Sequence, residues 1–80
     1  MTVHAPVGAP LTDGEIDILA LYADGHTSRT IAAQLGISQD TVWTRTASIR
    51  HKLGTHTITQ SVVVAYRTGQ LHLAAPRSAA

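Results

Sequence analysis

The segment 38–53 carries most of the side chains in this sequence that could recognise another molecule. On a helix, with about 100° between successive residues, its apolar positions fall on one narrow stripe that must face a core. That stripe consists of Val42, Thr46, Ile49 and Leu53. The opposite side collects short or hydrogen-bonding side chains, namely Asp40, Thr44, Ala47 and His51, flanked by Trp43 and Ser48. Because this side is too polar for a core and less charged than a solvated helix, it predicts non-covalent recognition of a partner at close range.

Enzymatic chemistry is poorly represented in the sequence. The chain has no cysteine, no glycine loop that could cradle a phosphate, no HExxH motif and no serine in a nucleophile-elbow pattern. Its histidines, at positions 4, 26, 51, 56 and 72, lack the i, i+4 spacing that places two metal ligands on one helix face. The sequence therefore predicts that the protein is not an enzyme and uses no metal, cofactor or small-molecule ligand.

Four helices are predicted by the residues that begin and end them. Thr12 and Glu15 form a capping box that opens a helix to about Ala23, and Gly25 ends it. The same signals predict helices from Thr27 or Ser28 to Leu35, from Ser38 to Leu53, and from Thr57 to about Thr68, with Gly36, Gly54 and Gly69 just beyond them. No segment alternates as a half-buried strand does. The sequence therefore predicts an all-α domain at 11–73, with flexible tails at 1–10 and 74–80.

The charge distribution is more informative than the net charge of +1. Residues 1–24 hold four acidic and no basic side chains, whereas residues 25–80 hold six basic and one acidic, for a charge of +5. A basic portion of this kind suits a polyanion if the fold gathers the cations on one face, and an ordinary solvated surface is the alternative. The longest run of aliphatic residues has four members, far below the ~20 of a membrane span, so we expect a cytoplasmic protein without membrane contact.

The junction at 35–38 has the composition of a helix-turn-helix. Gly36 permits a sharp reversal, Ile37 fills the junction, and Ser38 caps the next helix. In that motif the second helix enters the DNA major groove while the first crosses the backbone. A helical hairpin inside a bundle uses the same turn, so the pattern favours DNA binding without excluding this alternative.

Four short motifs extend the pattern over nearly the whole predicted domain. They are LTxxE at 11–15, IAxxLxIS at 31–38, TV at 41–42 and IxxKLG at 49–54, with further matches at Ile18, Leu19, Leu21, Ala23, Gly25, Val62, Ala65, Gly69 and Leu71. Together they resemble the LuxR-type (GerE-type) helix-turn-helix domain of bacterial transcription regulators. The resemblance implies a four-helix fold, double-stranded DNA as partner, and pairing of two copies through the fourth helix.

The chain departs from this family at four positions. The family usually has a basic residue at Gly14, lysine at Trp43, histidine at Arg45 and arginine at Ile58. Glycine inside a helix costs about 1 kcal/mol and would loosen the first turn. A tryptophan can stack on a sugar, pack on a thymine methyl or anchor a protein, but it cannot neutralise a phosphate.

The sequence and the resemblance together predict a stand-alone regulator that inserts the third helix, Ser38 to Leu53, into the major groove. We expect Asp40, Trp43, Thr44, Ala47 and Ser48 to approach base edges. We expect Thr41, Arg45, Arg50, His51 and Lys52 to contact phosphate or sugar, with support from Arg29 and Thr30. Ser38, at the start of the third helix, is also expected to contact DNA. No basic side chain points straight outward for a bidentate guanine contact, so the sequence preference should be modest.

Two further expectations concern partners. In the fourth helix we expect an inward face made of Ile58, Val62 and Ala65, with Tyr66 at its border. The outer face, made of Val63, Val64 and Arg67, is then expected to form a weak two-fold dimer contact. The alternative is that these valines are scattered surface residues without a partner. The alternative function is a protein-interaction module of the same fold, in which Trp43 contacts another regulator or RNA polymerase and DNA binding is weak or lost. Only ten residues precede the first helix, so we expect control by expression level, dimerisation or a partner rather than by a sensing domain.

Overall fold

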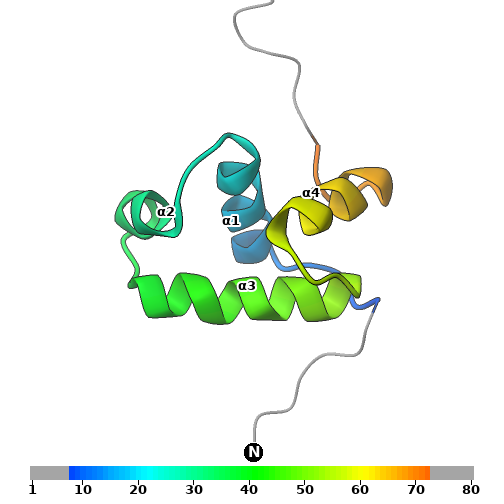
Figure 1. Cartoon of the computed structure of the whole chain (residues 1–80), viewed down its shortest axis with the longest axis horizontal. Coiled ribbons are helices and arrows are strands. Elements are labelled where there is room, and N and C mark those ends of the chain that lie inside the picture. Colours follow the sequence, from blue (N-terminus) through cyan, green and yellow to red (C-terminus); the bar gives the residue numbers. More distant parts are fainter. Residues whose placement is uncertain (1–7, 73–80) are drawn as a thin grey trace, which may run out of the picture.

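The computed structural model describes residues 8–72 and contains four helices in that part of the chain (Figure 1). They are α1 at Asp13–Ala23, α2 at Ser28–Leu35, α3 at Gln39–Leu53 and α4 at Ile58–Arg67. Residues 8–72 hold no strand, and each helix begins and ends within a residue or two of its predicted position. The predicted all-α class is therefore confirmed.

The helix boundaries follow from local hydrogen bonds. At the start of α1, the Glu15 N–H donates to Thr12 Oγ1 at 3.2 Å, and the Thr12 N–H donates to Glu15 Oε1 at 2.8 Å, as the capping box requires. At the end of α2, Gly36 takes the left-handed conformation with φ of 68°. This conformation carries a steric penalty for residues with a Cβ, which explains why glycine ends the helix there.

The helices pack around a single core. Figure 1 shows α3 running along one side of the molecule, with α1 over its middle, α2 near its beginning and α4 near its end. The side chains that fill the core are Leu11, Ile18, Leu19, Ile31, Ala32, Val42, Ile49, Ala65 and Leu71. α1 and α3 each contact the three other helices, so α3 is held by α1, α2 and α4 together.

The buried face of α4 differs from the predicted one. Val62 and Ile58 are only half-buried, whereas Ser61 is fully buried together with Ala65. The Ser61 hydroxyl lies 2.6 Å from Thr55 Oγ1 and 2.8 Å from the backbone oxygen of Thr57. Because the buried Ser61 hydroxyl has two hydrogen-bond partners, its burial costs little free energy. Ser61 therefore lies on the inward face of α4, and Val62 lies at the edge of the core.

The chain before α1 is held at two points. The Gly8 N–H donates to the Lys52 backbone oxygen at 2.7 Å, and the Leu11 N–H donates to Gln70 Oε1 at 2.8 Å. Residue 8 belongs to the expected N-terminal tail, and the domain bounds at 11–73 stay a prediction. The rest of the expected tails, at 1–7 and 74–80, lies outside the described residues.

Candidate nucleic-acid interface

The turn between α2 and α3 fixes the direction of α3. The Ile37 N–H donates to the Ala32 backbone oxygen at 3.0 Å, and the half-buried Ile37 side chain packs against the core. Ser38 then begins α3 by accepting a hydrogen bond from the Thr41 N–H at 3.1 Å. A short helix, a left-handed glycine and a capped longer helix together make the helix-turn-helix geometry.

The outer face of α3 is exposed along its length. This face consists of Asp40, Trp43, Thr44, Ala47 and His51, all of which are exposed. Trp43 keeps 53% of its surface accessible, which is unusual for the largest apolar side chain in a small domain. The inward stripe is buried at Val42, Thr46 and Ile49 and half-buried at Leu53. The predicted division of α3 into an inner and an outer face is confirmed by this burial pattern.

Several hydroxyl groups expected to contact DNA make hydrogen bonds at a helix start or within their own helix. Ser38 Oγ lies 2.9 Å from Thr41 Oγ1, and Thr44 Oγ1 donates to the Asp40 backbone oxygen at 2.9 Å. In α2, Thr30 Oγ1 accepts a bond from the Thr27 N–H at 3.0 Å. Ser38, Thr44 and Thr30 are exposed and Thr41 is half-buried, so these hydroxyls lie at the surface while they make hydrogen bonds within the domain.

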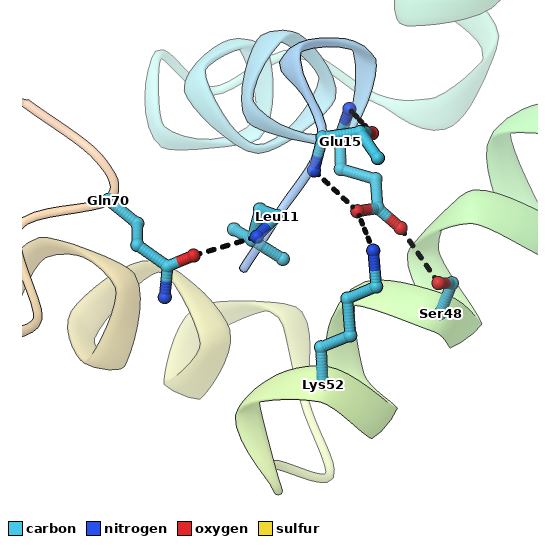
Figure 2. A network of polar contacts seen from close by, with 6 residues as sticks. Leu11, Glu15, Ser48, Lys52 and Gln70 are labelled. Atoms are coloured by element: carbon cyan, nitrogen blue, oxygen red, sulfur yellow. Dashed lines mark hydrogen bonds and ion pairs between the residues drawn. The ribbon is translucent and has the colours of Figure 1, made fainter. Parts of the chain in front are cut away.

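Lys52 and Ser48 take positions that the sequence did not indicate. The Lys52 ammonium donates to Glu15 Oε1 at 2.7 Å, and the Ser48 hydroxyl donates to Glu15 Oε2 at 2.7 Å (Figure 2). Lys52 is buried and Ser48 half-buried, and both turn toward α1. We therefore revise their roles: Lys52 and Ser48 hold α3 against α1, which leaves their polar groups engaged inside the domain.

The Glu15 carboxyl is the centre of this contact. Its burial raises the pKa of the group, because a charge is poorly solvated inside the domain. Hydrogen bonds from Lys52, the Thr12 backbone and Ser48, together with the charge of Lys52, outweigh that effect. The pKa of Glu15 therefore lies below its ordinary value of 4.5, and the group carries its charge in the folded domain. Sequence reasoning identified only the capping role of Glu15.

Three arginines remain available for a polyanion. Arg29 and Arg45 are exposed and Arg50 is half-buried, and none has an ion pair or side-chain hydrogen bond with another residue in the described part of the chain. Arg29 lies on α2, and the other two lie on α3. Their guanidinium groups therefore keep their donors for an external acceptor.

Position 14 is a further feature of the site. An ideal Cβ at Gly14 would lie 2.9 Å from Nη1 of Arg45, so the guanidinium rests against the first turn of α1. The sequence singled out Gly14 and Arg45 separately and gave no sign that they touch.

The outer face of α4 is partly apolar. Val63 keeps 42% of its surface accessible and Tyr66 keeps 54%, and Arg67 beside them is exposed. Val64 is half-buried, so it lies nearer the core than expected. The exposed apolar pair of α4 is thus Val63 and Tyr66, which lie one turn apart.

The described part of the chain contains neither a metal-binding cluster nor a membrane-spanning helix. Within 8–72, no group of three or more histidine, cysteine or acidic side chains is placed to hold a metal ion. In the same residues, every helix is too short or too polar to cross a membrane.

Comparison with known proteins gives a consistent picture. The family model described as GerE, bacterial regulatory proteins, luxR family, matches residues 9–65. The transcriptional regulatory protein YdfI of Bacillus subtilis is 41% identical over 61 residues, which are 76% of this chain and 29% of YdfI. The HTH-type transcriptional activator RamA of Corynebacterium glutamicum is also 41% identical over 61 residues, or 76% of this chain and 22% of RamA. The chain thus spans less than a third of the length of these relatives.

Solved structures agree with the sequence relatives. The structure of the transcription factor GerE superposes with a TM-score of 0.76 at 31% identity and covers 80% of this chain and 96% of GerE. The crystal structure of the phage VqmA–DPO complex gives a TM-score of 0.71 at 29% identity, covering 94% of this chain and 34% of VqmA.

Proposed function

Because the chain belongs to the LuxR family of bacterial regulatory proteins, we propose that it is a DNA-binding transcription regulator whose α3 enters the major groove. The observation that carries this proposal is the exposed outer face of α3 with unpaired arginines beside it. A face of short side chains lets the helix approach base edges, and cations beside it meet the phosphates that line the groove.

The contacts divide by side-chain chemistry. Asp40, Thr44 and Ala47 are the exposed groups that reach base edges, together with Trp43, whose ring can pack on a thymine methyl. The phosphate and sugar contacts come from Arg29, Arg45, Arg50, His51, Thr30, Ser38 and Thr41. Phosphate contacts set the register of the helix and base contacts carry the sequence preference.

A gel shift against fragments of bacterial genomic DNA tests this function. We expect binding at low salt that weakens steeply as salt rises, because each neutralised phosphate releases counterions. Absence of any shift at low salt would exclude DNA as the partner.

A second candidate function rests on the exposure of Trp43. A tryptophan with half of its surface accessible is typical of an anchor at a protein interface, so the same face could bind another regulator or RNA polymerase. Trp43→Ala separates the two functions in the same gel shift. If DNA is the partner, this variant should bind more weakly. If Trp43 anchors a protein, the variant should bind DNA as the wild type does and lose the protein.

We also infer that two copies pair on DNA through the outer face of α4. Val63 and Tyr66 expose an apolar surface that an isologous two-fold contact would bury, with Arg67 at its edge. The surface is small, so pairing should depend on two neighbouring half-sites that hold both copies.

A further inference from the structure

One flank of α3 faces the first turn of α1. Arg45, Ser48 and Lys52 follow one another at i, i+3 and i+7, a spacing that places them on one side of a helix. Ser48 and Lys52 both donate to Glu15, in the first turn of α1. Arg45 therefore extends along the same flank toward the beginning of α1.

Arg45 meets α1 at the residue next to Glu15. A Cβ at Gly14 would lie 2.9 Å from Nη1 of Arg45, which is closer than two such atoms approach in folded proteins. A side chain at position 14 would therefore displace the guanidinium. Because Nη1 is the far end of a flexible side chain, this displacement would leave the helix backbone where it is.

The Arg45 guanidinium rests on α1 and remains available to an external hydrogen-bond acceptor. Arg45 is exposed, and it has no ion pair or side-chain hydrogen bond with the residues at 8–72. It lies on the flank of the exposed face of α3, at the edge where a groove-bound helix meets phosphates. Because the guanidinium rests on α1, less side-chain freedom is lost when a phosphate is bound.

We propose that Gly14 is a positioning residue for DNA binding, because its missing side chain lets the Arg45 guanidinium rest on α1 and meet a backbone phosphate from there. This inference rests on the proposed function. It assigns to α1, which does not enter the groove, a part in placing a cation of α3. It also gives the glycine in a helical first turn a function that offsets its helix-weakening effect.

The test is a titration of Gly14→Ala and wild type against a duplex that the wild type selects from a random-sequence library. We expect about eightfold weaker binding at 0.1 M salt and a log–log salt slope flatter by about 0.9, as for the loss of one phosphate contact. The melting temperature should stay the same or rise by a few degrees, because alanine favours a helix more than glycine does. Affinity and stability should thus move in opposite directions, which a merely structural role of position 14 would not produce.

The effect of Gly14→Ala is also measured in two variants that each lack one arginine. In Arg45→Ala, the Gly14→Ala change should have no further effect on binding. In Arg29→Ala, which removes a guanidinium that does not contact Gly14, it should weaken binding as much as in the wild type. An effect that persists without Arg45, or a lowered melting temperature, would overturn the inference.

The two proposals fail in different ways. If the wild type binds DNA and Gly14→Ala binds equally well with the same slope, only the inference about Gly14 is wrong. If the wild type binds no duplex at low salt, the proposed function is wrong and the inference falls with it.

Discussion

The ammonium of Lys52 lies 2.7 Å from Oε1 of Glu15, and both side chains are almost fully buried between α1 and α3. A buried ion pair costs desolvation, but removing one partner leaves the other charge buried without compensation. We expect Lys52→Met to lower the free energy of unfolding by about 3 kcal/mol, measured by urea denaturation. Glu15→Gln combined with Lys52→Met should cost less than the two single changes together, because the double variant leaves no charge unpaired. Additive losses would contradict the pairing.

The low pKa of Glu15 predicts an acid-sensitive fold. Because the pKa of this carboxyl is lower in the folded than in the unfolded chain, its charge stabilises the fold. The contribution is complete above the unfolded value of 4.5 and is lost as the pH falls through the folded pKa. We expect the free energy of unfolding to fall more steeply below pH 4.5 for the wild type than for Glu15→Gln. Parallel curves in urea titrations across this range would show that Glu15 is not the group responsible.

The helices could be predicted because the signals that begin and end them are local. Thr12 and Glu15 are three residues apart, and Gly36 acts on the turn in which it lies. Such signals depend on neighbouring backbone amides, so they need no knowledge of the tertiary structure.

The candidate site was less predictable because its side chains contact residues that lie far away in the sequence. Glu15 and Lys52 are 37 residues apart in the sequence, and a lysine on a recognition helix looks like a phosphate contact until that carboxylate is placed beside it. Gly14 and Arg45 were likewise two separate departures from a family pattern, and only packing brings them into contact. The outer face of α3 was predictable, since helical periodicity alone separates Val42 from Thr44.

The different surroundings of Arg50 and Lys52 predict different effects on DNA binding. Arg50 has no side-chain partner within residues 8–72, so Arg50→Ala should flatten the log–log salt slope by about 0.9 and leave stability nearly unchanged. Lys52→Met should leave the slope near that of the wild type and lower stability instead, because its ammonium is bound to Glu15. Duplex titrations over a salt series, run under conditions where both variants are folded, measure the slopes. A flatter slope for Lys52→Met would return Lys52 to the set of phosphate contacts.

The outer face of α4 predicts cooperative binding to paired half-sites. Val63 and Tyr66 are exposed, so Val63→Glu with Tyr66→Glu should leave the fold intact and bring like charges together in a two-fold contact. Val64 is left unchanged, because it is half-buried and its replacement would disturb the core as well. We expect the double variant to bind a single half-site nearly as the wild type does and to lose cooperativity on a duplex with two half-sites about one helical turn apart.

The control for the α4 variant is Ala23→Glu, which adds negative charge at an exposed position at the end of α1. This control should weaken DNA binding slightly by charge and keep the cooperativity, since position 23 lies outside α4. Binding curves on one-site and two-site duplexes separate the two effects. The cooperativity is the ratio of the affinity for the second site to that for the first, and the general effect of charge cancels in it. If the α4 variant keeps the wild-type ratio, the two copies pair elsewhere or bind independently.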